Sequence, residues 1–176
     1  MFSNIVMEVD CSIIYVHHYK SITIFIIVHS ASLNVVFHKR KDLYISSLLY
    51  RSTMKKELFK HIIKEFHEME LPKIKPRDLF IPETKKIITL VGPRRAGKTF
   101  YFYQIINNLI EKVPRERIIY INFEDDRILP LDVKDLDNLL EGYYELYPEN
   151  KGKEIYLFFD ELQNIKGWEV YIRRIS

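Results

Sequence analysis

Two glycines, a lysine and a threonine stand at a spacing that suits the binding of a polyphosphate. They form the segment Gly92-Pro93-Arg94-Arg95-Ala96-Gly97-Lys98-Thr99, which fits the pattern G-x-x-x-x-G-K-[ST] at every fixed position. The glycines should let the chain curl so that backbone N–H groups point inward at an anion. We expect Lys98 to reach the β- and γ-phosphates of ATP and Thr99 to ligate Mg²⁺ through its hydroxyl. The predicted nucleotide-binding residues are 92–100, which include Phe100 in the first turn of the following helix.

A pair of acids follows an apolar run further along the chain. Residues Ile155 to Phe159 are apolar, and Asp160 and Glu161 come directly after them. Asp160 is expected to hold Mg²⁺ opposite Thr99, and Glu161 to orient or deprotonate the attacking water. By itself, an apolar run that ends in two acids is weak evidence for a metal site. The phosphate loop upstream makes this interpretation much stronger. The expected catalytic residues are therefore Glu161 and Lys98.

The elements around these residues alternate between strand and helix. Short apolar runs predict strands buried on both faces, and amphipathic segments that end near a proline predict helices. The predicted order is strand Ile87–Val91, helix Lys98 to about Glu111, strand Ile118–Phe123, helix from about Val133 to Tyr147, and strand Ile155–Phe159. This order is typical of βαβ crossovers, so the expected fold class is α/β, a P-loop three-layer sandwich with a parallel sheet. The strand that carries Asp160 is expected beside the strand of the phosphate loop.

The composition changes at Met54. Residues 1–53 contain no Gly, no Pro and one Ala, whereas Lys and Glu become frequent from Met54 onward. One hypothesis is that residues 1–53 are an upstream extension and that Met54 is the natural start. The alternative is a small β-rich module with strands at Ile13–Val16, Ile22–Val28 and Asn34–Phe37. The expected organisation thus has three parts. Residues 1–53 are an extension, residues 54–85 contain an amphipathic helix from Leu58 to Leu71 and an extended lead-in, and residues 86–176 are the N-terminal part of a P-loop domain.

Three stretches resemble one family, the prokaryotic AAA-type ATPases common in archaea. They are Leu90–Thr99, Tyr120–Asp125, and Phe159–Asn164 followed by Gly167-Trp168-Glu169. The resemblance covers about Leu71 to Ser176 and implies an ATPase core, with Lys98 and Thr99 on the nucleotide and Asp160 with Glu161 on metal and water. Family members usually add a C-terminal winged helix and a nuclease-like domain.

The chain departs from the family where it stops, in the helix after the acidic strand. The next strand with its sensor residue, the arginine finger and the lid are expected to be missing, which should slow hydrolysis far more than it weakens binding. A truncated sheet also leaves an edge that favours self-association or a protein partner.

Composition limits the other possibilities. The single cysteine, Cys11, allows no intrachain disulfide, and no apolar run reaches the ~20 residues that span a bilayer, so we expect a cytoplasmic protein and no membrane partner. A formal net charge of +3 leaves a nucleic-acid partner possible but unsupported.

Competing functions are weighed by their motifs. The main alternative is a nucleotide-binding remnant or interaction fragment without turnover. A small-molecule kinase would need a lid and an acceptor pocket. A GTPase and an ABC-type ATPase would need N-K-x-D and L-S-G-G-Q, and neither motif occurs. Several other charged residues are expected to have structural and not functional roles. Arg173 and Arg174 are expected on the solvated face of the last helix, and Glu124, Asp125 and Asp126 in turns or helix caps. His17 and His18 are not expected to bind metal.

Overall fold

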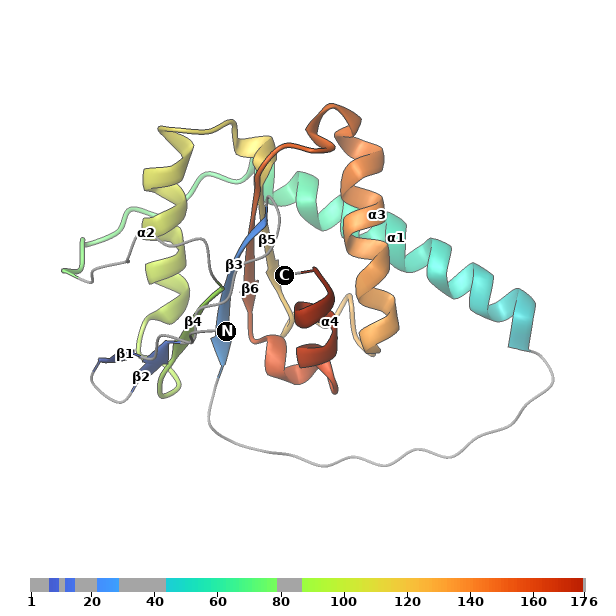
Figure 1. Cartoon of the computed structure of the whole chain (residues 1–176), viewed down its shortest axis with the longest axis horizontal. Coiled ribbons are helices and arrows are strands. Elements are labelled where there is room, and N and C mark those ends of the chain that lie inside the picture. The colour runs from blue at the N-terminus through green and yellow to red at the C-terminus, as the bar shows by residue number, and fades with distance from the viewer. Residues whose placement is uncertain (1–6, 10–11, 15–21, 29–43, 79–86, 176) are drawn as a thin grey trace, which may run out of the picture.

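A parallel four-stranded sheet lies at the centre of the molecule (Figure 1). The computed structural model describes residues 7–9, 12–14, 22–28, 44–78 and 87–175, with side chains from residue 51 onward. The sheet has the order β4-β3-β6-β5, and all of its pairings are parallel. Its strands are β3 (Ile22–Val28), β4 (Ile88–Val91), β5 (Ile118–Asn122) and β6 (Ile155–Asp160). A separate antiparallel pair consists of β1 (Met7–Val9) and β2 (Ser12–Ile14).

Helices cover both faces of this sheet, as the α/β class requires. The α-helices are α1 (Tyr44–Glu68), α2 (Lys98–Ile110), α3 (Asp137–Leu146) and α4 (Trp168–Ile175). Single 3₁₀ turns lie at η1 (Arg115–Arg117), η2 (Val133–Leu136), η3 (Pro148–Asn150) and η4 (Leu162–Asn164). Figure 1 shows α2 on one side of the sheet and α1, α3 and α4 on the other. The three layers confirm the expected fold class.

The position of β6 corrects one expectation from the sequence. The strand that ends in Asp160 does not lie beside β4, because β3 is inserted between them. Ile26 of β3 pairs with Thr89 on one side and with Phe159 on the other. The predicted strand at Ile22–Val28 therefore exists, but it is the second strand of the central sheet rather than part of a separate module. The predicted strand at Asn34–Phe37 lies outside the described residues.

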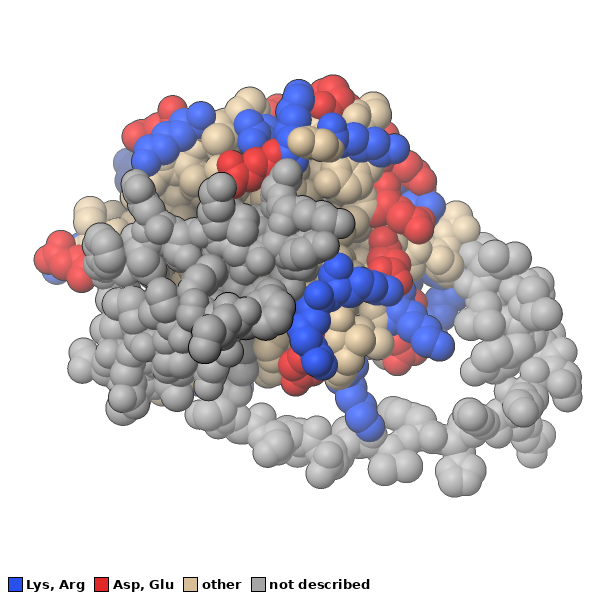
Figure 2. All heavy atoms as spheres, viewed as in Figure 1, with Lys and Arg blue, Asp and Glu red and all other residues tan. Residues whose placement is uncertain are grey.

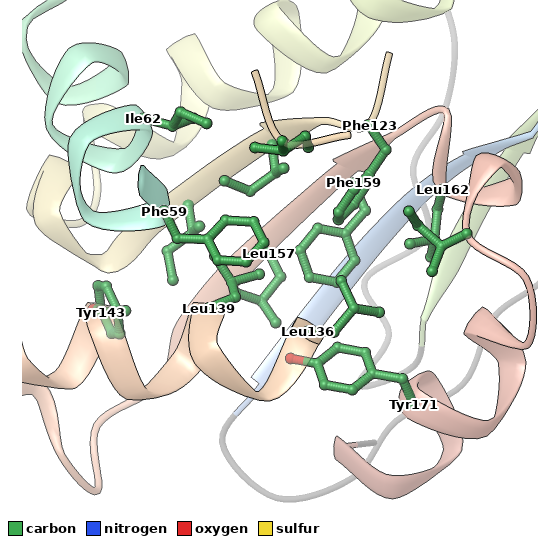
Figure 3. Close-up of a cluster of buried hydrophobic side chains, with 14 of the residues drawn as sticks. Phe59, Ile62, Phe123, Leu136, Leu139, Tyr143, Leu157, Phe159, Leu162 and Tyr171 are labelled. Carbon is green, nitrogen blue, oxygen red and sulfur yellow. The ribbon is translucent and has the colours of Figure 1, made fainter. Parts of the chain in front are cut away.

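Two apolar clusters hold the layers together, one on each face. The cluster under α2 contains the buried residues Ile88 and Leu90 of β4 together with Phe102 and Phe158. The larger cluster fills the space between the sheet and the helices α1, α3 and α4, and Figure 3 shows it. Its labelled members include Phe59, Phe123, Leu139, Phe159 and Tyr171. Strands β5 and β6 contribute residues to both clusters and are therefore buried on both faces, which explains their nearly continuous apolar sequences.

Helix α1 is longer than the sequence pattern indicates. It begins at Tyr44 instead of Leu58, and it runs without a break through the predicted boundary at Met54. No Gly or Pro interrupts residues 44–68, so nothing in the sequence stops the helix before it reaches the predicted start. The buried face centres on Phe59, Ile63 and Phe66, while Met69, predicted on this face, lies beyond the helix and is 36% exposed.

Helix α3 contains a glycine because α1 crosses it closely. A Cβ at Gly142 would lie 3.2 Å from the Cγ atoms of Lys56 and Lys60 and 3.3 Å from the Lys56 carbonyl oxygen. Beside this contact, Lys56 Nζ is 3.1 Å from Glu141 and 3.0 Å from Glu145, and Lys60 Nζ is 2.5 Å from Glu145. These ion pairs are largely solvated, so each contributes little to the free energy of folding. The close approach of α1 and α3 at Gly142 therefore depends mainly on the packing of apolar atoms.

The remaining elements agree with prediction to within a few residues, with one difference in type. The predicted helix from Val133 to Tyr147 is divided into the 3₁₀ turn η2 and the α-helix α3. A capping box explains the start of η2: the Asp135 side chain accepts a hydrogen bond from the Asp132 N–H at 2.9 Å, and the Asp135 N–H is directed at the Asp132 side chain. Helix α3 ends at Leu146, two residues before Pro148, as expected.

His67 joins α1 to β5 and to the end of α3. Its Nε2 is 2.8 Å from the Ile118 carbonyl oxygen, and its Nδ1 is 2.8 Å from the Tyr147 hydroxyl oxygen. Because a carbonyl only accepts, Nε2 must donate, and in the neutral ring Nδ1 accepts from Tyr147. Burial lowers the pKa of His67, and nearby Arg115 lowers it further, while the Ile118 carbonyl and Glu116 oppose this shift.

Because of His67, we expect the free energy of unfolding to decrease as the pH falls below about 6.5, the ordinary histidine pKa. The pKa of His67 is lower in the folded protein than in the unfolded chain. The contribution of His67 to stability is therefore fully present above pH 6.5 and is lost as the pH falls through its folded-state pKa. His67→Gln should flatten this part of the profile in urea unfolding between pH 5 and 8. His61→Gln, at an exposed position of the same helix, should retain the wild-type slope. Equal slopes for His67→Gln and wild type would contradict the assignment.

Candidate functional site

The loop between β4 and α2 has left-handed backbone at two positions. Gly97 has φ 81° and Arg95 has φ 64°. A Cβ at Gly97 would also lie 2.4 Å from an Nη atom of Arg77, but this is the end of a flexible side chain that can move, so the positive φ is the reason for glycine at this position. Among the described residues of the loop, the positions with positive φ are thus 95 and 97. The first turn of α2 contains no acidic residue, which leaves its positive end uncompensated by its own side chains.

Lys98 folds back over this loop. Its ammonium group donates to the carbonyl oxygens of Gly92 and Pro93, both at 2.8 Å, and the residue is only 6% exposed. Burial lowers the pKa of Lys98, although the carboxylates of Glu161 and Asp160 act in the opposite direction. The lysine is therefore held by weak neutral acceptors in a partly dehydrated position, where an anionic acceptor would bind it more strongly.

Asp160 meets the loop from the end of β6. Its Oδ2 accepts hydrogen bonds from Thr99 Oγ1 at 2.6 Å and from the Tyr120 hydroxyl at 3.1 Å. The other carboxylate oxygen, Oδ1, is buried and has no hydrogen-bond partner among the described residues. Burial raises the pKa of Asp160, while the hydrogen bonds from Thr99 and Tyr120 lower it. The predicted contact between Thr99 and Asp160 is thus present, although β4, the strand before the loop, is not a neighbour of β6.

Glu161 begins the turn that follows β6. It has φ 57°, an uncommon conformation for a residue with a Cβ, and it is 7% exposed. Gln163 Nε2 donates to its Oε2 at 2.5 Å. Left-handed backbone at a non-glycine residue costs roughly 1–2 kcal/mol, and such strain is concentrated at functional positions. The turn directs two consecutive acids, Asp160 and Glu161, to the same end of the sheet as the loop.

The other predicted loop residues occupy less committed positions. Arg94 is mostly exposed and makes a long ion pair of 3.8 Å with Glu124. Ala96 N–H donates to the Pro93 carbonyl oxygen at 3.3 Å, which closes the loop as a turn. Phe100 is 51% exposed, and its ring lies edge-on to Tyr103 at a centroid separation of 6.2 Å. No contact in the described structure assigns Phe100 a role at the loop.

Three residues near the loop were not singled out as site residues from the sequence. Arg77 Nη1 donates to the Ala96 carbonyl oxygen at 2.8 Å, and the backbone of Arg77 exchanges two hydrogen bonds of 3.0 Å with the Gln104 side chain. Tyr120 is the third, through its contact with Asp160. Arg77 lies in a segment without regular structure, so no periodicity indicated it. Tyr120 is a hydroxyl-bearing residue in an apolar strand, which was a usable signal.

Arg173, Arg174 and Asp125 contact residues outside the phosphate loop. Arg174 pairs with Asp137 of α3, and Arg173 Nε is 3.4 Å from the Glu169 carbonyl oxygen within α4. Asp125 binds the Arg127 guanidinium at 2.7 Å in the turn after β5. His17 and His18 lie outside the described residues.

The surface shown in Figure 2 carries charges of both signs. On the face shown in Figure 2, Lys and Arg side chains are interspersed with Asp and Glu over the described residues. Within the described ranges, no group of three or more His, Cys, Asp or Glu residues could hold a metal ion. A metal at Asp160 would therefore need ligands from a bound phosphate or water as well as from the protein. No helix among the described residues is both long and apolar enough to span a bilayer.

The chain is similar to two curated relatives from Methanocaldococcus jannaschii. Uncharacterized protein MJ1544 is 36% identical over 140 residues, which cover 77% of this chain and 28% of the relative. Uncharacterized protein MJ1637 is 32% identical over 100 residues, which cover 56% of this chain and 20% of the relative. The chain thus spans less than a third of the length of either relative. Residues 54–176 are about 70% of the chain, so the similarity to MJ1544 must include residues before Met54.

No solved structure gives a significant match. A family model described as "AAA domain" matches residues 84–176, just over half of the chain and all of the loop, β5 and β6. The match includes both the phosphate loop and the acidic end of β6. The chain therefore belongs to the AAA-domain family of P-loop ATPases.

Proposed function

We propose that this chain binds ATP together with Mg²⁺ at residues 92–99, with Asp160 facing the metal. Membership of the AAA-domain family indicates a nucleotide-binding, ATPase-like function. The observation that carries the proposal for this chain is the 2.6 Å contact between Thr99 Oγ1 and Asp160 Oδ2 beside a loop of left-handed backbone. It brings a hydroxyl, a carboxylate and a helix N-terminus to one place, as a Mg-nucleotide requires.

The lysine supplies the charge for the phosphates. Lys98 Nζ contacts two carbonyl oxygens of the loop, and a phosphate oxygen would replace these neutral acceptors with an anionic one. In the present contacts only the donor is charged, whereas in a lysine–phosphate contact both partners would be charged, which makes the hydrogen bond shorter and stronger. The exchange favours the phosphate, so the folded-back lysine is compatible with nucleotide binding.

The residues at the end of β6 fit a divalent cation. Asp160 Oδ1 is a buried carboxylate oxygen without a hydrogen-bond partner in the part of the chain that the structure describes, which is costly unless a cation or a donor binds it. Thr99 supplies a hydroxyl oxygen beside it, and oxygen ligands are what Mg²⁺ prefers. Mg²⁺ bound there would neutralise phosphate charge, while Thr99 and Asp160 would hold the cation and Lys98 the phosphates.

Equilibrium titration with a fluorescent ATP analogue tests the proposal. The purified chain should bind the analogue in the presence of Mg²⁺ and bind it more weakly in EDTA, because Thr99 and Asp160 would hold a cation whose charge offsets that of the phosphates. An inorganic-phosphate or GTP competitor series would then rank ligand classes at the same site. Absence of binding at millimolar analogue, by a protein shown to be folded, would remove the proposal.

Hydrolysis is a second candidate function, and Glu161 favours it. The residue is buried, strained in its backbone and adjacent to Asp160, as expected for a group that positions water. If the chain hydrolyses ATP, wild type should release phosphate and Glu161→Gln should bind the analogue normally without releasing phosphate. Glu149→Gln, at an exposed position away from the loop, is the matched control. Binding without phosphate release by the wild type would instead support the non-hydrolysing alternative.

A further inference from the structure

Tyr120 connects β5 to the acidic end of β6. It lies on the face of the sheet that α2 covers, opposite Phe158 in the β5–β6 register, and it is 9% exposed. Its hydroxyl donates to Asp160 Oδ2 at 3.1 Å. Burial raises the pKa of Tyr120, and the neighbouring Asp160 carboxylate raises it further, so the phenol keeps its proton and remains a donor. The Tyr103 side chain also interacts with this hydroxyl, so the Asp160 carboxylate is one of its two polar partners.

The ring of Tyr120 is fixed from two sides. Its centroid is 5.6 Å from the Phe66 ring of α1 and 5.4 Å from the Tyr103 ring of α2. A ring packed in this way holds its hydroxyl in place without relying on the hydrogen bond itself. The position of the donor is therefore set by the fold, and the carboxylate must adjust to it.

Two hydroxyls converge on one oxygen of Asp160. Thr99 and Tyr120 both donate to Oδ2, and Oδ1 is left buried without a hydrogen-bond partner among the described residues. The two contacts fix the rotation of the carboxylate, and a bound cation would satisfy Oδ1. The Tyr120 contact involves no loop residue, so it does not depend on what the Thr99 hydroxyl binds.

We propose that Tyr120 is a positioning residue for the metal of the bound nucleotide: it holds the Asp160 carboxylate in the orientation that accepts Mg²⁺. The inference rests on the proposed function and extends it to a residue of β5. The group required for this positioning is the hydroxyl of Tyr120 and not its aromatic ring. A purely structural role would instead make the hydroxyl important for stability and unimportant for the metal.

The test measures metal and nucleotide separately, with Mn²⁺ as a probe visible in electron paramagnetic resonance. Tyr120→Phe removes one oxygen and keeps the ring. The Mn²⁺ concentration that half-saturates the nucleotide complex should rise about tenfold, the effect of losing a hydrogen bond to a charged group. Affinity for the nucleotide in EDTA should change less than twofold. Tyr156→Phe, whose hydroxyl contacts Glu154 at 3.0 Å on the surface, should behave as wild type in both measurements.

A double-mutant comparison with Asp160→Asn separates positioning from general damage. If Tyr120 acts through Asp160, Tyr120→Phe should have no further effect on Mn²⁺ once Asp160 is replaced. Replacing Tyr120 by 4-aminophenylalanine, which keeps a donor at this position, should restore most of the Mn²⁺ affinity and covers the case of a poorly folded phenylalanine variant. Unchanged Mn²⁺ half-saturation in Tyr120→Phe, with metal-dependent binding by the wild type, would overturn the inference. Loss of all metal-dependent binding in the wild type would instead overturn the proposed function, and the inference with it.

Discussion

Lys98→Ala is expected to weaken the binding of ATP with Mg²⁺ by about 10- to 150-fold. The substitution removes a charged donor worth about 1.5–3 kcal/mol, and each 1.4 kcal/mol is a factor of ten in the dissociation constant. The lysine is buried beside the loop, and its acceptors there include the carbonyl oxygens of Gly92 and Pro93. Fluorescence titration of the ATP analogue measures the change.

The control for this substitution is Lys112→Ala. Lys112 is an exposed lysine just beyond the C-terminal end of α2, the opposite end from the loop. Its loss changes the net charge by the same amount, so it reports any nonspecific attraction of the nucleotide. Thermal unfolding of both variants verifies that they are folded. Equal affinity of Lys98→Ala and wild type would show that the phosphates bind elsewhere.

Phe159→Ala should lower the free energy of unfolding by about 3–5 kcal/mol, the usual cost of deleting a buried aromatic side chain. Phe159 is completely buried in the cluster of Figure 3, and its ring lies edge-on to Phe123 at 5.5 Å. It also occupies the middle of the sheet, where it pairs with Ile121 of β5 and Ile26 of β3. A loss of this size is a large part of the 5–15 kcal/mol that stabilises an ordinary domain.

Urea unfolding at pH 8 measures the effect of Phe159→Ala. Phe159→Leu should recover more than half of the loss, because it restores most of the volume. Val170→Ala, at a position of α4 that is 60% exposed, should change the stability by less than about 0.5 kcal/mol. A loss below about 1 kcal/mol in Phe159→Ala would mean that the cluster under α1, α3 and α4 is not tightly packed.

The sequence was most informative where local chemistry decides the structure. The start of α2 at Lys98 and the strands around the loop were predicted to within one residue, because the motif fixes a strand, a turn and a helix in order. The meeting of Thr99 with Asp160 was also predicted, since both stand at the carboxyl ends of parallel strands.

Long-range features escaped prediction for physical reasons. The insertion of β3 between β4 and β6 depends on strand pairing across more than sixty residues, and no local pattern encodes which strands become neighbours. The partners of Lys98 and the role of Tyr120 depend on tertiary contacts in the same way. The predicted boundary at Met54 stays a prediction, although α1 crosses it and the similarity to MJ1544 extends before it.

The most direct test is a crystal structure of the chain with Mg²⁺ and a non-hydrolysable ATP analogue. We predict that the phosphates lie against residues 92–99, that Lys98 Nζ donates to a phosphate oxygen, and that the metal lies beside Thr99 and Asp160. Phosphates bound elsewhere, or a Lys98 side chain without a phosphate contact in the saturated complex, would contradict this.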